Sequence, residues 1–364
     1  MRVALDEQIF AVQPYGGISR LFYEMASAFV RDPELGVELE RLDAPVVNEY
    51  LLADEELTAR LGVRRASGPY RALGHYVARR RRTAPADVVH NTFYMPRGLG
   101  EHPSSQRVVT VYDMIPELLP KTRRRLDFLT EKHRYVRSAD HIICISESTR
   151  RDLLRVYPDI HAPVTIAYPG VGPAFRPDSG SSRTQPEPYI LHVGNRSSYK
   201  DGATLLRAFV QIANRMPDYT LYLVGGGPLT KAEREILAPR GLLSRVRQES
   251  LPDSDVPAAY AAAAVTVFPS RYEGFGLPGV EAMASGSPLV LADTSSLPEV
   301  GGSAARYFPP GDERTLAAVL VEVLGDADAQ REMGEAGVAQ ARRFSWSGYA
   351  AANVEAYRAV LGEG

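Results

Sequence analysis

The sequence predicts an α/β protein of two doubly wound domains, each with a parallel sheet covered by helices. Short apolar runs alternate with longer amphipathic segments along nearly the whole chain. Few of the short runs alternate polar and apolar residues, which is typical of strands buried on both faces. A length of 364 residues suits two domains of ordinary size better than a single core.

The first domain is expected over residues 1–170. Its expected strands are MRVAL at the N-terminus, ADVVH (86–90), RVVTVYD (107–113), HIICIS (141–146) and PVTIAY (163–168). After the first strand, apolar side chains follow the i, i+3, i+4, i+7 spacing of a helix that buries one face. These side chains are Ile18, Leu21, Phe22, Met25 and Phe29.

The second domain is expected over residues 187–345. A stretch rich in Pro, Gly and Ser precedes it, and we expect a linker over 171–186. The expected strands are YILHVG (189–194), YTLYLVGG (219–226), AVTVFPS (264–270) and PLVLAD (288–293). A last helix begins after Ser345, a residue type that caps helices. Two such domains predict a cleft facing the carboxyl ends of both sheets, where open α/β sheets bind ligands.

The composition indicates a cytoplasmic protein. A formal net charge of -2 gives no field that favours nucleic acid. The single cysteine, Cys144, cannot form an intramolecular disulfide and fits a reducing compartment. No apolar run reaches the roughly 18 residues of a membrane span. The run ARRRR (78–82) leaves open a weak peripheral contact at the inner membrane face, although such runs are usually solvated. The sequence does not indicate an oligomeric state.

The stretch SRYEGFGLPGVEAMASG (270–286) carries two glutamates that follow a strand. Glu281 falls in the first turn of the next helix, where the helix dipole favours a carboxylate in any case. Glu273 lies in a glycine-rich turn that has no such structural reason for a charge. Gly274 and Gly276 would let backbone amides approach a ligand. The turn therefore suits a sugar joined to a phosphate.

Two other segments place positive charge or free amides at strand ends. Arg196 and Lys200, in HVGNRSSYKDG, lie between a strand and a helix and would stabilise a departing diphosphate. The alternative for this pair is a solvated loop with two exposed bases. Gly16 and Gly17, in PYGGISR (14–20), open the first helix, whose free amides attract anions. The alternative there is an ordinary turn into a helix.

Together these segments resemble the retaining nucleotide-sugar glycosyltransferases of family 4, which have the GT-B fold. EGFGLPGVE matches the family's E-x7-E motif, and PYGGISR, HVGN…K, VGGGP and FPSRYEGFG occur in the family's order. The resemblance spans nearly the whole chain. It implies that the C-terminal helix, residues 346–364, crosses back to the first domain.

The resemblance implies roles for the matched residues. Glu281 would hold the ribose hydroxyls of the nucleotide, and Glu273 would lie by the hydroxyls of the donor sugar. Arg196 and Lys200 would bind the diphosphate and so act in the reaction, with Glu273 and Asp113. The other donor-binding positions implied are Gly16, Gly17, Asn195, Gly226, Leu251, Gly274, Phe275, Gly276 and Leu277.

The acceptor side is less well defined. Many relatives carry a His-Asp pair where TVYDMIPEL has Tyr112 and Asp113, so a histidine-based role is in doubt here. A tyrosine titrates near pH 10 and is a poor proton carrier at neutral pH. Asp113 is a catalytic candidate, with capping of the next turn as the alternative. Tyr15, Asn91, Thr92 and Tyr112 are the expected acceptor-side residues.

No metal ion or other cofactor is expected. DSD (253–255) looks like the D-x-D metal motif of the other glycosyltransferase fold, but it precedes VPAAYAAA, where acidic residues ordinarily cap a helix. His192 lies inside an apolar strand and is expected to be structural.

The function expected is retaining hexosyl transfer from a nucleotide sugar to a hydroxyl of a saccharide, glycolipid or small molecule. VVTVYDMIPE looks most like bacterial polysaccharide and O-antigen mannosyltransferases, so GDP-mannose is the first expectation, followed by UDP-glucose and related UDP-sugars. The family is thought to react at one face, with the leaving phosphate helping to deprotonate the acceptor. A nucleotide-sugar 2-epimerase of the same fold and a non-catalytic sugar-nucleotide-binding protein remain alternatives.

Overall fold

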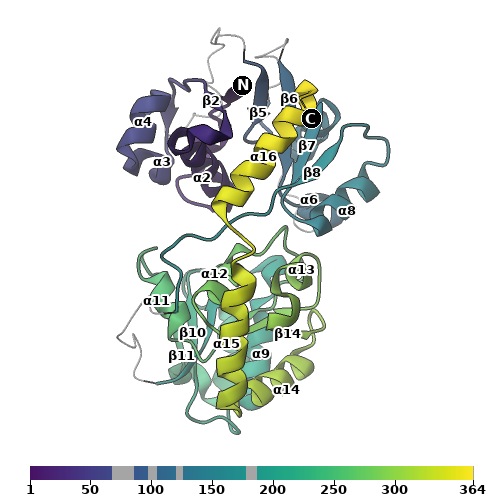
Figure 1. Ribbon diagram of the computed structural model, residues 1–364. Coiled ribbons are helices and arrows are strands. Elements are labelled where there is room, and N and C mark those ends of the chain that lie inside the picture. Colours follow the sequence, from purple (N-terminus) through teal and green to yellow (C-terminus); the bar gives the residue numbers. More distant parts are fainter. Residues whose placement is uncertain (68–85, 97–104, 120–125, 178–186, 364) are drawn as a thin grey trace. The chain divides into compact units, whose positions relative to one another are not determined.

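The computed structural model describes residues 1–67, 86–96, 105–119, 126–177 and 187–363 (Figure 1). The chain forms two compact units, the first comprising 1–170 and 346–364, the second comprising 171–345. The basic run 78–82 and residues 178–186 of the expected linker lie outside the described residues. Among the described residues, no helix combines the length and apolar character needed to cross a membrane.

The first unit contains a parallel sheet whose strand order is β2-β1-β5-β6-β7-β8. Its strands are β1 (Arg2–Leu5), β2 (Glu38–Leu39), β5 (Val88–Asn91), β6 (Gln106–Val111), β7 (His141–Cys144) and β8 (Val164–Ile166). Two short strands, β3 (Pro45–Val46) and β4 (Arg64–Arg65), pair separately. The α-helices described in this unit are α1 (Gln8–Val12), α2 (Gly17–Arg31), α3 (Glu49–Ala53), α4 (Glu55–Leu61), α6 (Ile115–Leu118), α7 (Leu126–Arg137), α8 (Glu147–Val156) and α16 (Trp346–Leu361).

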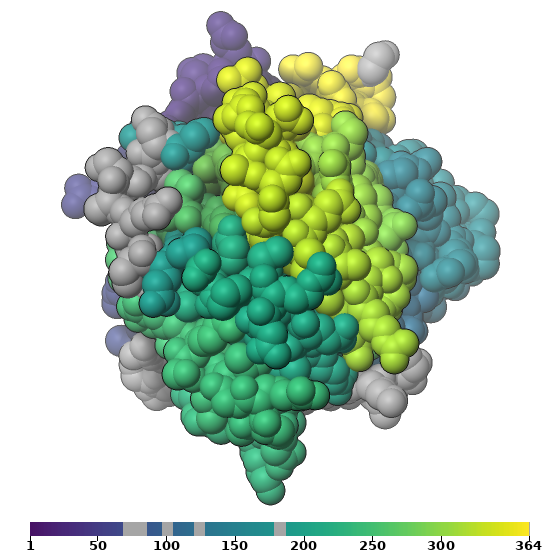
Figure 2. Space-filling model, turned by 90° about the horizontal axis from the view of Figure 1, so that it is seen from below, coloured from purple at the N-terminus to yellow at the C-terminus, as the bar shows by residue number. Residues whose placement is uncertain are grey.

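The second unit contains a parallel sheet whose strand order is β11-β10-β9-β12-β13-β14, the order of a doubly wound nucleotide-binding fold. Its strands are β9 (Tyr189–Val193), β10 (Thr220–Val224), β11 (Val246–Glu249), β12 (Val265–Phe268), β13 (Leu289–Ala292) and β14 (Ala305–Phe308). The α-helices described in this unit are α9 (Gly202–Ile212), α10 (Lys231–Leu237), α11 (Val256–Ala261), α12 (Leu277–Ala284), α13 (Leu297–Gly301), α14 (Glu313–Leu324) and α15 (Ala327–Ala341). In Figure 2, α14 and α15 lie side by side on one face of this unit, in lime and yellow.

The burial of side chains explains which elements the sequence revealed. All nine expected strands are present, and their central residues are almost fully buried in most of them. The strands that the pattern missed include β11 and β14, at the two edges of the second sheet. Both carry charged residues, such as Arg247 and Arg306, because an edge strand needs less apolar surface. In α2, the expected residues Leu21, Phe22 and Met25 are buried.

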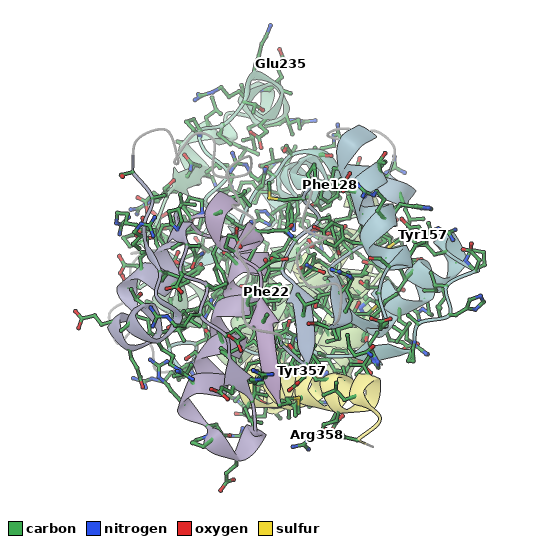
Figure 3. All side chains as sticks on the ribbon, turned by 90° about the horizontal axis from the view of Figure 1, so that it is seen from above. Phe22, Phe128, Tyr157, Glu235, Tyr357 and Arg358 are labelled. Carbon is green, nitrogen blue, oxygen red and sulfur yellow. The ribbon has the colours of Figure 1, made fainter. Side chains whose placement is uncertain are left out.

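The C-terminal helix α16 packs on the first unit against α2, β6 and β7, as expected for the crossing helix. Tyr357 of α16 is fully buried, and its hydroxyl lies 2.7 Å from Nδ1 of His90. Nε2 of His90 lies 2.8 Å from Oγ1 of Thr110, and the ring of Phe22 packs edge-on against the imidazole. Figure 3 shows Tyr357 on α16 and Phe22 on α2. A histidine buried under two helices thus joins the two ends of the chain.

This histidine predicts a pH dependence of stability. Burial lowers the pKa of His90 from 6.5 to about 3. Between those values the unfolded chain binds a proton that the folded chain does not, so stability falls as the pH falls through this window. Between about pH 7 and pH 4.5, the free energy of unfolding of the wild type should fall by about 2 kcal/mol more than that of His90→Gln, as measured by urea unfolding.

The matched control for His90 is His133→Gln, since His133 is exposed on α7. Its stability should follow the wild-type pH profile. Equal slopes for the wild type and His90→Gln would show that His90 titrates alike in the folded and unfolded chain.

Candidate functional site

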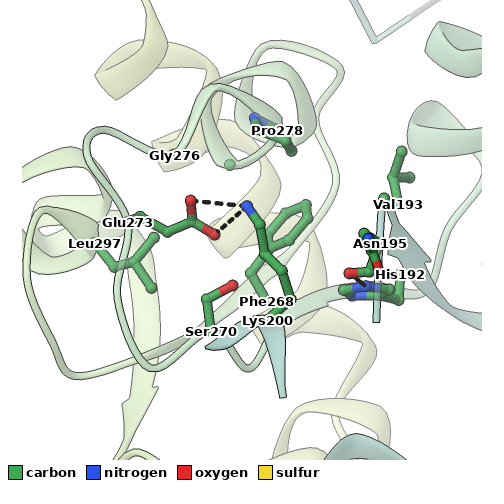
Figure 4. Close-up of a pocket in the computed structure, with 12 residues that line it drawn as sticks. His192, Val193, Asn195, Lys200, Phe268, Ser270, Glu273, Gly276, Pro278 and Leu297 are labelled. Atoms are coloured by element: carbon green, nitrogen blue, oxygen red, sulfur yellow. Dashed lines mark hydrogen bonds and ion pairs between the residues drawn. The ribbon is translucent and has the colours of Figure 1, made fainter. Parts of the chain in front are cut away.

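A pocket lies at the carboxyl end of the second sheet, where the strand order reverses between β9 and β12 (Figure 4). Doubly wound sheets bind their ligands at this reversal. The residues that line the pocket are His192, Val193, Gly194, Asn195, Lys200, Phe268, Ser270, Glu273, Gly276, Pro278, Gly279 and Leu297. The expected donor-binding residues Asn195, Lys200, Glu273 and Gly276 therefore meet in one place.

Lys200 and Glu273 form an ion pair in this pocket. Nζ of Lys200 lies 2.7 Å from Oε1 and 2.9 Å from Oε2 of Glu273, so the amine faces both carboxylate oxygens (Figure 4). The side chains of Lys200 and Glu273 are 27% and 13% exposed. The pair is partly shielded from water yet reachable by a ligand.

The turn that carries Glu273 is held by two serines before α13. The Glu273 amide donates to Oγ of Ser295 at 2.9 Å, and Oγ of Ser296 donates to the carbonyls of Glu273 and Phe275. Gly276 has φ 102°, and a Cβ there would lie 3.0 Å from Leu297. Glycine is therefore needed at the start of α12, and the turn is fixed before any ligand binds.

The loop that carries Lys200 is held in an uncommon conformation. Ser198 and Asp201 have φ values of 56° and 48°, which non-glycine residues rarely adopt. Nε of Arg271 donates to Oδ2 of Asp201 at 2.9 Å, and the Arg271 amide donates to the Tyr199 carbonyl at 2.7 Å. Arg271 lies two positions before Glu273, so it ties the Lys200 loop to the Glu273 turn. No motif in the sequence indicates this link.

Arg196 does not line the pocket in this structure, and its contact with phosphate stays a prediction. Its side chain is 3% exposed and pairs with Glu233, with Nε 2.7 Å from Oε1. Its other nitrogens donate to the carbonyls of Gly225 and Gly227, each at 2.8 Å. A Cβ on Gly226 would lie 2.7 Å from this guanidinium. Arg196 therefore holds the loop 225–228 (GGGP) through buried hydrogen bonds, whereas its neighbour Asn195 lines the pocket.

Glu281 lies on the side of α12 that faces α11. The hydroxyl of Tyr260 in α11 has a pKa raised well above its usual value, first by burial and then by the negative charge of Glu281. Leu251, half-buried, lies in the segment before α11. Asp255 stands at the N-cap of α11, but its side chain makes no capping hydrogen bond, contrary to the capping expected for DSD.

At the first sheet the expected acceptor-side positions are largely internal. Asn91, Thr92 and Tyr112 are 1%, 0% and 5% exposed, so they present little surface to an acceptor, and their acceptor contacts stay a prediction. Nδ2 of Asn91 donates to Asp6 at 2.7 Å, and the hydroxyl of Tyr112 donates to the Thr92 carbonyl at 2.7 Å. Burial also raises the pKa of Tyr112 well above its usual value. These side chains therefore form hydrogen bonds with neighbouring residues at the end of the sheet.

Asp6 is the centre of this network and was missed by the sequence analysis. It follows β1, is 6% exposed, and accepts hydrogen bonds from Gln8, Asn91 and Thr92. Burial raises its pKa to about 6 despite these donors. The one signal in the sequence was an aspartate directly after a strand, which many structural residues share.

Three residues of the first unit that were expected at the site, Tyr15, Gly16 and Asp113, lie at the surface or in a turn. Tyr15 is 60% exposed, beside Gly16 at the start of α2. Gln13 partly fills the helix end, because its Oε1 accepts a hydrogen bond from the Ser19 amide at 2.9 Å. Oδ1 of Asp113 accepts from the Ile115 amide at 2.9 Å, which is the capping alternative. A catalytic role for Asp113 stays a prediction.

Histidine and carboxylate residues were also considered as metal ligands. Within the described ranges, no group of three or more His, Cys, Asp or Glu side chains is arranged to hold a metal ion. His192 lies 3.0 Å from the Val267 carbonyl, and burial lowers its pKa. It lines the pocket as a hydrogen-bonded side chain.

Comparisons with known proteins match both units. Residues 15–175 match the description Glycosyltransferase Family 4, and residues 187–326 match Glycosyl transferases group 1. The O-antigen chain mannosyltransferase B of Escherichia coli is 32% identical over 73% of this chain and 72% of its own length. An MMP alpha-(1->4)-mannosyltransferase of Mycolicibacterium hassiacum is 30% identical over 66% of this chain and 59% of its own length.

Solved structures share the architecture. A sucrose-phosphate synthase from Thermosynechococcus elongatus aligns over 100% of both chains with a TM-score of 0.76 and 21% identity. WaaG, a glycosyltransferase involved in lipopolysaccharide biosynthesis, aligns over 99% of this chain and 100% of its own with a TM-score of 0.69 and 17% identity. Both units match glycosyltransferase descriptions, and the Escherichia coli relative is 32% identical over 73% of this chain. The chain therefore belongs to the family 4 glycosyltransferases and has the GT-B fold.

Proposed function

We propose that the protein is a retaining mannosyltransferase that uses GDP-mannose and transfers mannose to a hydroxyl of a saccharide or glycolipid. The observation that carries this proposal is the Lys200–Glu273 pair at the strand-order reversal of the second sheet. The pair offers a cation for a diphosphate and a carboxylate for sugar hydroxyls within one pocket. The mannosyltransferase names of two sequence relatives favour mannose over other hexoses.

In the proposed mechanism the Lys200 amine leaves Glu273 and binds the donor diphosphate instead. The pair then separates, and the freed Glu273 carboxylate accepts hydrogen bonds from hydroxyls of the donor sugar. The N-terminus of α12, opened by Gly276, adds a positive end to the same pocket. Glu281, on the α11 side of α12, would hold the ribose, and Leu251 would lie beside the base. The protein thus supplies orientation and positive charge for the leaving group.

The transfer breaks the bond between sugar C1 and the phosphate oxygen and forms a bond between C1 and the acceptor oxygen. The acceptor hydroxyl proton passes to the leaving phosphate, so no strong protein base is required. Attack from the face that the phosphate leaves keeps the configuration at C1. We also propose that Lys200 and the helix end supply the charge that a metal would supply elsewhere, so that the reaction is independent of added metal.

The test is transfer from GDP-mannose, with UDP-glucose for comparison, to a panel of mannosides and glycolipids. The proposal expects acceptor-dependent release of GDP, unchanged by a chelator, and an α-linked product by proton NMR. An inverted product, or loss of activity with the chelator, contradicts the corresponding part of the mechanism. A sugar altered without acceptor would favour the epimerase, and donor binding without turnover would favour a non-catalytic binding protein.

A further inference from the structure

We propose that a tyrosine platform on the first unit, formed by Tyr15, Tyr23 and Tyr50, is a subsite for a sugar ring of a saccharide acceptor. The inference rests on the proposed function and names a class of acceptor for it. The three side chains come from the loop before α2, from α2 and from α3. The site lies wholly within one unit of the chain.

The three rings pack against one another. Tyr15 and Tyr50 meet edge to face, with ring centroids 5.4 Å apart, and Tyr50 stacks on Tyr23 at 5.9 Å. Tyr15 is 60% exposed, while Tyr50 and Tyr23 are half-buried. An exposed tyrosine backed by two others presents a large face at low entropic cost for a ligand to cover.

The platform is held in place by a buried residue. Asn48 is fully buried and donates from Nδ2 to the carbonyls of Gln13 and Pro14, at 3.0 and 3.2 Å. Its Oδ1 accepts from the Leu51 amide and so caps α3, which carries Tyr50. One side chain therefore fixes both the loop of Tyr15 and the helix of Tyr50. A ligand meets a surface that is already ordered.

Polar groups surround the rings. Arg65 donates hydrogen bonds to Glu49 from both of its terminal nitrogens, at 2.6 and 2.9 Å, and this contact raises the pKa of Arg65. On the other side, Asp54 accepts from the Tyr23 hydroxyl at 3.1 Å and from Arg31 at 2.8 Å. Carboxylates and guanidinium groups that face each other can instead bind hydroxyls.

This combination fits a pyranose ring. The axial C–H groups of a sugar form a weakly positive, apolar face that suits the negative face of an aromatic ring. The equatorial hydroxyls at its edge reach the polar rim, as in other small-molecule sites that surround an apolar surface with a few polar groups. The acidic residues Glu49, Asp54, Glu55 and Glu56 near the platform disfavour an anionic lipid surface as the occupant.

The test compares Tyr15→Ala and Tyr50→Ala with the wild type, using the oligosaccharide acceptor that supports transfer. We expect each variant to raise the acceptor KM about five- to tenfold, with kcat, the donor KM and the melting temperature nearly unchanged. Tyr15→Trp should retain the wild-type KM. Leu154→Ala is the control, since Leu154 is a large apolar side chain exposed elsewhere on the unit, on α8. An unchanged acceptor KM in the folded Tyr15→Ala and Tyr50→Ala variants overturns the proposal.

Two further measurements separate the alternatives. If Tyr15→Ala instead weakens binding to vesicles of equal phosphatidylglycerol and phosphatidylcholine, with the acceptor KM unchanged, the platform is a membrane contact and the proposal fails. Saturation-transfer NMR with α-mannotriose detects saccharide binding without catalysis. Loss of that signal in Tyr15→Ala supports the subsite even if no donor is turned over, whereas failure of transfer contradicts only the proposed function.

Discussion

Lys200→Ala is expected to lower kcat/KM for the sugar-nucleotide donor by about 10²- to 10³-fold, the loss typical of removing one group that stabilises a developing negative charge. In the structure Lys200 is the cation that reaches both oxygens of Glu273 in the pocket. Without it the diphosphate would depart with less stabilisation, and Glu273 would repel it. Steady-state kinetics with varied donor, at saturating acceptor, measure the effect.

Lys231→Ala is the matched control for this experiment. Lys231 belongs to the same unit, is 92% exposed, and lies 3.8 Å from Glu235 in a surface pair. Its removal should leave kcat/KM within twofold of the wild type. A Lys200→Ala enzyme that retained more than half of the wild-type kcat/KM would show that the phosphate contact lies elsewhere.

Arg196→Ala is expected to destabilise the second unit by about 3–5 kcal/mol, because it leaves the buried Glu233 carboxylate without its cation. It also removes the donors that hold the carbonyls of Gly225 and Gly227. The loss should appear as a lower melting temperature of that unit in calorimetry, with lower activity only as a consequence of unfolding.

Arg331→Ala serves as the control for Arg196. Arg331 is 58% exposed on α15 and pairs with Asp328 at the surface, so its removal should change stability by less than about 0.5 kcal/mol. An Arg196→Ala protein with a normal melting temperature and a raised donor KM would restore the phosphate role that the sequence predicted for this residue.

The order of motifs along the chain was enough to predict the fold and to assign Lys200 and Glu273 to one donor site, but not their ion pair. Both residues follow strands that neighbour each other at the strand-order reversal, so the topology alone brings them together. The sequence could not say which way a side chain leaves a loop. Arg196 turns inward while Asn195 reaches the pocket, although the two are adjacent.

In the first unit, too, the sequence could not predict the direction in which side chains leave their loops. Asn91 and Thr92 stand at the end of β5, but they turn toward Asp6 and fill the space themselves. Tyr50 lies 35 positions after Tyr15, and no spacing rule connects them. Asn48 brings the two tyrosines together, and its role depends on backbone carbonyls that a sequence does not reveal.

The structure of the second unit with GDP-mannose bound tests the central claim most directly. The account predicts that Nζ of Lys200 lies within hydrogen-bond distance of the diphosphate, that Glu273 binds hydroxyls of the sugar, and that Arg196 remains on Glu233. A diphosphate held by Arg196, with the Lys200–Glu273 pair intact, would contradict it.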